Sequence, residues 1–458
     1  MIKDKKSIIF VLILGIGLCS GCNSNGRKTN SSFDKEEMAD QVKSEFLHAW
    51  NGYKEYAWGM DELKPLSKSY KNWYDKSMLI TPMDAFDTMV LMGLIEEAKE
   101  VKELLLSKLD FDRDIFVSTF ETNLRFLGSL LSAYQLDGDP RFLDLAIDLA
   151  NRLLPVFNTE TGMPWARVNL KTGEVKGETS NPAEIGTLLL EFGSLSKLTG
   201  NPIYYSKAKK ALVAVYQRRS KLGLVGTTLN IHTGEWLNQD AHLSGCIDSY
   251  YEYLLKAWLL FGDAECKEMW EMSIKGINKH LAQEYDGDLW YGHVDMHTGA
   301  RTHSHFGALE ASFPSVLALG GDLRQAQKLE ESCRRIWKLY GVEPEQIDYR
   351  SKEVVWGHYF LRPGNLESAY YLYQYTRDEK YLKVGQEYFE SLIQNCRTEV
   401  GYSELSDIVS KEKNDILQSF FFAETMKYLY LLFAPKETLN FREVIFNSEA
   451  HPIRKTWK

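Results

Sequence analysis

The chain has 458 residues, of which 44% are hydrophobic and 13% aromatic, enough for one large globular domain or two smaller ones. This composition excludes disorder for most of the chain. The formal net charge of -9, without a sustained basic block after the N-terminus, argues against a nucleic acid as the partner. A neutral substrate fits this charge better.

The N-terminus has the organisation of a secretory signal: lysines, an apolar run over residues 7–18, then small residues before Cys22. The run is too short to span a bilayer comfortably. Cys-Ser-Gly-Cys at 19–22 resembles a bacterial lipoprotein box. We therefore expect a lipoprotein signal peptide over 1–21, a lipid on Cys22 and a flexible tether over 22–36. An ordinary cleaved signal is the alternative.

These features predict a protein of the bacterial cell envelope, on its periplasmic or cell-surface side, that touches the membrane only through the lipid at Cys22. Four further cysteines, at positions 246, 266, 333 and 396, are widely separated and form no CxxC pair. They indicate neither a disulfide scaffold nor a zinc site. The histidines, including His242, His303 and His305, show no metal-binding spacing along the chain.

From Met83 onward the sequence is dominated by amphipathic helical patterns that come in pairs. Similar turns recur near positions 93, 138, 200, 262, 321, 377 and 433. Gly, Asp or Asn at most of these turns closes one helix and opens the next. Such a period indicates stacked or closed helical hairpins. We predict an all-α, single-domain (α/α)7 barrel over 37–458 with short β-hairpin loops; six hairpins or an open solenoid are the alternatives.

Acidic or amide residues recur near the start of the helix that precedes each turn. They are Asp84, Asp87, Glu121, Glu184, Asp248, Glu252, Glu310, Glu367 and Gln418. Singly, most would be ordinary residues of a first helical turn, where the helix dipole favours carboxylates. In a closed array these helix starts meet at one end, together with Arg125, Arg362 and several aromatic rings. This combination predicts a carbohydrate-binding cleft.

Several long segments resemble those of one known protein family. They are TPMDAFDTMVLMGL (81–94), FETNLRFLGSLLSAY (120–134), DSYYEYLLKAWLLFGD (248–263), SFFFAETMKYLYLLF (419–433) and FNSEAHPI (446–453). Together they resemble glycoside hydrolase family 47, which comprises class I α-1,2-mannosidases and the endoplasmic-reticulum degradation-enhancing mannosidase-like proteins. Residues 218–241 and 308–323 are more similar to the degradation-enhancing branch. The resemblance implies an inverting, calcium-dependent hydrolase, here expected to be monomeric, acting on mannose-containing glycans.

The resemblance also implies roles for individual residues. Glu121 matches the proposed acid, Asp248 matches a second catalytic carboxylate, and Glu367 is a further candidate for water activation. Ser448 stands where the family holds Ca2+ through a threonine. Asp87, Arg125, Glu252 and Glu367 match further residues of the mannose pocket, and Arg362 beside them is a further candidate for substrate binding. Glu449 and Gln418 are expected in the surroundings of the cation.

Three positions depart from the family pattern: Gly364 and Gln418 replace glutamates, and Ser448 replaces the threonine. The glutamate missing at 364 is the family's usual candidate for the base, and loss of a base typically lowers the rate about 100-fold to 10000-fold. We therefore expect impaired or altered catalysis. The substitution Gly364→Glu should then raise the activity. A noncatalytic mannose-glycan binding lipoprotein is the main alternative, and an interaction scaffold without a sugar site is a third reading.

Overall fold

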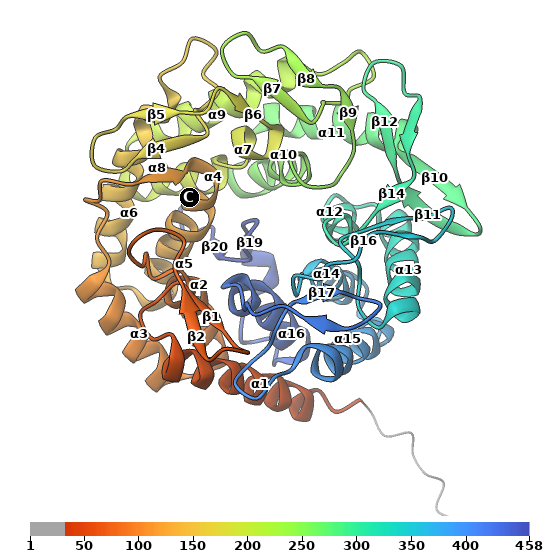
Figure 1. Cartoon of the computed structure of the whole chain (residues 1–458). Coiled ribbons are helices and arrows are strands. Elements are labelled where there is room, and N and C mark those ends of the chain that lie inside the picture. Colours follow the sequence, from red (N-terminus) through yellow and green to blue (C-terminus); the bar gives the residue numbers. More distant parts are fainter. Residues whose placement is uncertain (1–32, 458) are drawn as a thin grey trace, which may run out of the picture. The chain divides into compact units, whose positions relative to one another are not determined.

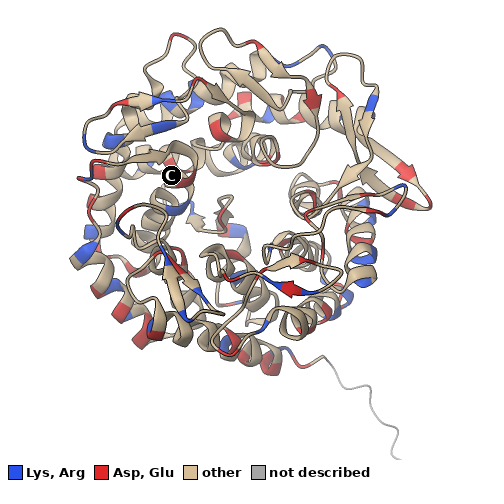
Figure 2. Ribbon diagram, in the orientation of Figure 1, with Lys and Arg blue, Asp and Glu red and all other residues tan. Residues whose placement is uncertain are grey.

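The computed structural model describes residues 33–457, and the compact unit within it begins at Lys35. The predicted signal peptide and the lipid site at Cys22 lie outside the described residues. Among the described helices, none combines the length and the apolar run that a membrane crossing requires. Lysine, arginine, aspartate and glutamate are interspersed around the outside of this unit (Figure 2).

The helices form a closed ring of two layers (Figure 1). The inner helices are α2 (Ile80–Met92), α5 (Gly128–Asp137), α8 (Leu189–Thr199), α10 (Asp248–Phe261), α12 (Phe313–Leu319), α14 (Gly364–Thr376) and α16 (Met426–Phe433). The outer helices are α3 (Ile95–Lys108), α6 (Pro140–Leu153), α9 (Pro202–Gln217), α11 (Ala264–His280), α13 (Leu323–Tyr340), α15 (Lys380–Cys396) and α1 (Lys35–Tyr56). This architecture confirms the predicted (α/α)7 barrel.

The helices of the two layers differ in how completely they are buried. In α2 every residue except Val90 is buried, whereas the outer helix α6 buries one face through Phe142, Ala146 and Leu149. Four of the inner helices end at a glycine in the left-handed conformation, at positions 93, 138, 200 and 262. Glycine adopts this conformation without a Cβ penalty, which explains why the turn signals stand out in the sequence.

At position 433 the structure differs from the sequence prediction, which places the turn of a seventh helical hairpin there. The sequence suggested a second helix after this turn, but α16 is followed by the short 3-10 helix η5 (Phe441–Glu443) and by strands β19 (Val444–Phe446) and β20 (Pro452–Arg454). The outer partner of α16 is α1, which packs beside it. The first and last helices of the ring therefore form its seventh pair.

Short antiparallel sheets lie on the loops that lead from outer to inner helices. The strands are β1 (Glu62–Lys64), β2 (Ser69–Lys71), β3 (Phe116–Ser118), β4 (Arg167–Asn169), β5 (Val175–Lys176), β6 (Thr179–Ser180), β7 (Thr228–Asn230), β8 (Trp236–Asn238), β9 (Asp240–Ala241), β10 (Ala282–Tyr285), β11 (Asp288–Tyr291), β12 (His293–Asp295), β13 (Arg301–His303), β14 (His305–Phe306), β15 (Gln346–Asp348), β16 (Val354–Trp356), β17 (Leu405–Asp407) and β18 (Glu412–Lys413).

Five of these hairpins share one turn chemistry. In each, an Asn or Asp side chain accepts hydrogen bonds from the backbone N–H groups two and three residues further on. The capping residues are Asn169, Asn230, Asp295, Asp348 and Asp407. This is the Asx turn, which mimics a backbone turn. The barrel repeat therefore includes its loops as well as its helices.

The β19–β20 hairpin lies inside the ring, and its loop, residues 447–451, meets the inner helices there (Figure 1). Asn447 caps the loop by accepting from the backbone N–H groups of Glu449 and His451. Its amide also donates to Glu191 of α8 at 2.9 Å. The loop is thus fixed to the barrel wall by a fully buried side chain.

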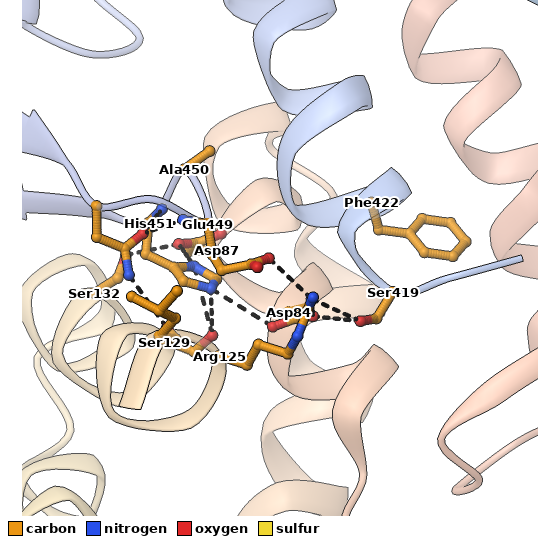
Figure 3. A network of polar contacts seen from close by, with 12 residues as sticks. Asp84, Asp87, Arg125, Ser129, Ser132, Ser419, Phe422, Glu449, Ala450 and His451 are labelled. Carbon is orange, nitrogen blue, oxygen red and sulfur yellow. Dashed lines mark hydrogen bonds and ion pairs between the residues drawn. The ribbon is translucent and has the colours of Figure 1, made fainter. Parts of the chain in front are cut away.

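A buried network of charges fastens the same loop to α2 (Figure 3). Asp87 lies 2.8 Å from Nδ1 of His451 and, through its other oxygen, 2.8 Å from Nζ of Lys427 in α16. Burial opposes the charged carboxylate, but Lys427 and His451 outweigh it and lower the pKa of Asp87 to about 2. Lys427 also donates to the carbonyl of Ala450 in the loop.

We predict that Lys427→Met destabilises the fold by about 3–5 kcal/mol, because it leaves the charge of Asp87 buried with one partner fewer. The free energy of unfolding, measured by urea denaturation with fluorescence detection, provides the test. Lys436→Met is the control: this lysine is exposed just beyond α16, so the change should stay within about 0.5 kcal/mol. Equal stabilities of the two variants would contradict the assignment.

Candidate active site

A cavity of about 340 Å³ opens where the inner helices begin. Its wall includes Glu121, Glu184, Asp248, Glu252, Glu367, Glu424 and Glu449, together with Arg125, Arg362, Phe120 and Phe313. Most of these residues lie in or just before the first turns of inner segments, among them α4 (Thr119–Glu121), α7 (Pro182–Gly186), α10 and α14. The acidic helix starts therefore meet at one end of the barrel, as the repeat predicted.

Arg125 organises one side of this cavity. It lies in a π-helical segment, η1 (Thr122–Leu127), between α4 and α5, and π-helical turns are frequent at functional sites. Its Nε donates to Glu121 at 2.8 Å, and its Nη1 donates to Glu449 at 2.9 Å and to Asp84 at 3.2 Å. Burial works against its charge, yet these carboxylates raise the pKa of Arg125 further. The arginine thereby connects the helix carrying Glu121 to the central loop.

Asp248 is the first residue of α10 and faces the cavity without an ion-pair partner among the described residues. Burial, together with the nearby charge of Glu252, raises the pKa of Asp248 to about 7. Glu252, one turn further on, is paired with the buried Lys256. Asp248 therefore exchanges its proton near neutral pH, which suits a general acid or base.

Three more carboxyl groups line the inner part of the cavity. Glu367 of α14 accepts from Ser315 at 3.0 Å, and burial raises the pKa of Glu367 to about 7. Burial likewise raises the pKa of Glu449 to about 7, despite Arg125. Glu424, in the π-helical segment η4 (Phe421–Thr425), has its pKa raised by burial and by the charge of Glu449. These groups repel one another, so a bound cation would stabilise their ionised forms.

Ser448 lies beside Glu449 in the central loop and also lines the cavity. Its backbone N–H donates to the hydroxyl of Tyr253 at 3.3 Å, which leaves its side-chain and carbonyl oxygens as possible cation ligands. The next residue but one, Ala450, has a positive φ of 56°, so the loop turns sharply here. An all-oxygen set with adjacent carboxylates fits a hard cation such as Ca2+.

Gly364, at the start of α14, also lines the cavity, but no side chain fits there. A Cβ atom on this residue would lie 2.9 Å from the carbonyl oxygen of Ala308 and 2.9 Å from the amide nitrogen of Ser312. Both are backbone atoms of the segment that contains the 3-10 helix η3 (Glu310–Ser312). The segment before α12 therefore occupies the space that a side chain at 364 would need, and Gly364→Glu cannot simply restore a carboxylate.

Of the residues predicted from sequence, Glu121, Asp248, Glu367, Arg125, Glu252, Arg362, Ser448 and Glu449 line this cavity together. Glu184 lines it too, whereas Asp84, Asp87, Glu310 and Gln418 do not. Asp87 is buried in the network with Lys427 and His451, and the amide of Gln418 donates to Glu404 at 2.6 Å. Asp87 thus supports the loop that carries Ser448 instead of facing the cavity.

Sequence reasoning missed Glu424 in the cavity wall and the buried Lys256 behind it. Both interrupt otherwise apolar helical runs, FFFAETMKYLYLLF and YYEYLLKAWLLF. A charged residue within such a run is costly to bury without a partner or a function. This pattern is the signal that could have identified them.

Several carboxyl groups in the wall of one cavity, accompanied by arginines and aromatic rings, define a glycoside hydrolase site. Comparison with known proteins agrees. The chain belongs to glycosyl hydrolase family 47, whose family profile matches residues 45–455.

The regions that align with the relatives cover most of this chain. It is 38% identical to Alpha-mannosidase I MNS4 of Arabidopsis thaliana, over 87% of this chain and 66% of the relative. It is 37% identical to human ER degradation-enhancing alpha-mannosidase-like protein 2, over 92% of this chain and 78% of the relative. The solved structure of an alpha-1,2-mannosidase from Trichoderma reesei superposes with a TM-score of 0.84 at 28% identity, over 92% of this chain and 99% of that one.

We predict that Gly364→Ala and Gly364→Glu each lower stability, by about 1–3 kcal/mol for the alanine, because the new Cβ overlaps fixed backbone. Neither should increase turnover. Gly245→Ala is a matched control in the same cavity, since its Cβ would meet only the flexible Leu309 side chain, at 3.1 Å. Urea denaturation and initial rates provide the measurements. A stable Gly364→Glu variant with a raised rate would refute this packing argument.

Proposed function

We propose that this protein is a calcium-dependent inverting glycosidase that removes terminal mannose from mannose-rich glycans. The observation that carries the proposal is the placement of Glu121 and Asp248 on the wall of one cavity that also holds arginine and aromatic side chains. The relatives support this substrate class. They include a human mannosyl-oligosaccharide 1,2-alpha-mannosidase IB, at 36% identity over 92% of this chain and 70% of the relative.

In the proposed reaction, the carboxyl group of Glu121 donates a proton to the glycosidic oxygen. Asp248 removes a proton from a water molecule that attacks the anomeric carbon from the opposite face, so the configuration inverts. Arg125 fixes the position of Glu121 through its 2.8 Å hydrogen bond. Glu252, Glu367 and Arg362 remain as hydrogen-bonding partners for sugar hydroxyls.

Asp248 is the preferred base because position 364 has no carboxylate, and because Asp248 has no ion-pair partner among the described residues and only a long 3.5 Å side-chain hydrogen bond, from Ser249. Glu252 is paired with Lys256, Glu449 with Arg125, and Glu367 accepts from Ser315. A pKa of about 7 means that Asp248 is mostly protonated below neutral pH. Since the base must be ionised, kcat/KM should fall as the pH drops through about 7.

Ca2+ would bind at Ser448 through the side-chain hydroxyl and the carbonyl oxygen. When bound, such an ion coordinates sugar hydroxyls and offsets the repulsion among nearby carboxylates. Glu449 and Glu424 would lie in its surroundings. Gln418 remains a predicted contributor only, since its amide is engaged with Glu404.

A noncatalytic mannose-glycan binding protein is the second candidate, and the closed position at Gly364 favours it. Packing at this position excludes the family's usual base, while the arginines and most carboxylates of the cavity remain. The lipid anchor at Cys22, the envelope location and the monomeric state stay predictions from the sequence.

Incubation of residues 33–458 with α-1,2-mannobiose and with a high-mannose glycan tests the proposal. Released mannose is expected, with inversion visible by NMR, and EDTA should abolish it. Addition of Ca2+ should restore activity, whereas Zn2+ alone should not. Glycan binding without any released mannose would establish the second candidate instead.

The two carboxyl roles can be separated with α-mannosyl fluoride, whose leaving group needs little protonation. We predict that Glu121→Gln lowers the rate on mannobiose about 100-fold to 10000-fold but retains most of the rate on the fluoride. Asp248→Asn should lose activity on both substrates. Glu399→Gln, at an exposed side chain, is the control and should change neither rate. Equal losses of Glu121→Gln on both substrates would rule out its role as acid.

A further inference from the structure

A second cluster of ligand-type side chains lies outside the carboxylate cavity. It consists of Asp240 in β9, His242 just after β9, and His293 in β12. The two strands pair within one sheet, with Val294 opposite Ala241 (Figure 1). One ligand atom from each of the three side chains lies within 4.8 Å of the other two. Both histidines are buried, and Asp240 remains partly accessible.

The hydrogen bonds around His242 identify the ring nitrogen that carries no proton and could bind a metal ion. Thr227 donates its hydroxyl proton to the carbonyl of Asp240, so the Nε2–H of His242 is the donor to the Thr227 oxygen, 3.0 Å away. Nδ1 then carries no proton and accepts from the backbone N–H of Ser244. An ion at Nδ1 would replace this weak contact and keep the Nε2 bond, which is how metal-binding histidines are held.

His293 supplies the second observation. Its Nδ1 lies 2.7 Å from Asp240 Oδ2, close enough for an ion to replace the shared proton. Its Nε2 and the Oε1 atom of Glu310 are both buried without a hydrogen-bond partner among the described residues, 3.9 Å apart. Once Nδ1 holds a metal, the ring proton of the neutral imidazole lies on Nε2, where Glu310 is the available acceptor. A metal ion at Nδ1 would therefore place a donor on Nε2 that faces the buried Glu310 oxygen, 3.9 Å away.

We propose that Asp240, His242 and His293 form a binding site for a divalent transition-metal ion, with Zn2+ as the first candidate. Two imidazole nitrogens and one carboxylate oxygen are a common zinc ligand set that leaves a fourth position open. Ca2+ prefers ligand sets made of oxygen, so this site differs from the one expected at Ser448.

The ionisation states of the ligands suit metal binding at neutral pH. Burial and the adjacent His293 ring lower the pKa of His242 to about 3, so its ring stays neutral. Hydrogen bonds from His293 and Thr302 outweigh burial and lower the pKa of Asp240, so its carboxylate is ionised.

The position of the site suggests a structural role at the cavity mouth. Residues 243, 245 and 246, directly after His242, line the carboxylate cavity, as do residues 308, 309 and 312 around Glu310. An ion would hold these two walls together through His242 and His293. His303 and His305 stack on each other at 4.8 Å, and each ring lies within 6 Å of that of His293. They extend the cluster towards solvent.

The experiment uses residues 33–458 stripped of metal by a chelator and then dialysed into buffer with millimolar Ca2+. Calorimetry and elemental analysis should show one Zn2+ bound per chain, and Co2+ should give the visible absorption of a four-coordinate nitrogen and oxygen site. His242→Gln and His293→Gln should each weaken Zn2+ binding more than about tenfold. His297→Gln, an exposed histidine in the same hairpin, is the control and should bind normally.

Circular dichroism of each variant establishes that a loss of binding is not a loss of folding. Glu310→Gln provides a second test, because glutamine has nearly the same shape as glutamate. It should weaken Zn2+ binding less than loss of one of the three metal-ligating side chains does. Absence of Zn2+ binding at tens of micromolar would overturn the proposal. So would binding that survives both His242→Gln and His293→Gln, which would place the ion at His303 and His305 or elsewhere.

Discussion

The active end of this barrel depends on one buried network of charges between the central hairpin loop and the inner helices. Asp87 holds Lys427 and His451, while Arg125 bridges Asp84, Glu121 and Glu449. Paired and hydrogen-bonded charges are retained in a low-dielectric interior only when their geometry is well satisfied. The network therefore places the loop that carries Ser448, and with it Glu449, at a defined position relative to Glu121.

Around this network the barrel gathers more carboxyl groups than it can keep ionised without help. Arg125, Arg362 and Lys256 neutralise some of them. The raised pKa values of Asp248, Glu367 and Glu449 show the remaining repulsion and desolvation. A site of this kind favours ligands that present hydroxyl groups or bring a cation. This is the physical reason that the proposed sugar and Ca2+ would suit the same cavity.

Gly364 shows how packing and chemistry constrain each other. In the sequence it is a missing carboxylate among neighbours that mostly match the family pattern. In the structure it is the point where the backbone around η3 approaches α14 too closely for any side chain. The absence of a carboxylate at 364 and the close approach of this segment go together, and the role of base passes to a residue on another helix if turnover is retained.

The sequence by itself determined the helical repeat, because glycine caps and apolar periodicity are local signals. It also determined the family and most of the cavity wall, because Glu121, Arg125, Asp248, Glu367 and Ser448 lie in long recognisable segments. Two predictions from the sequence were wrong: Asp87 does not line the cavity, and no second helix follows position 433. Neither burial nor the closure of the ring is encoded locally.

Only the tertiary structure decided which distant side chains meet. It paired α1 with α16, turned Asp87 towards Lys427 and brought Glu424 into the cavity. It also assembled Asp240, His242 and His293, whose spacing along the chain carries no metal signature. Contacts between residues separated by tens or hundreds of positions depend on the closure of the whole ring, and no local pattern of residues specifies them.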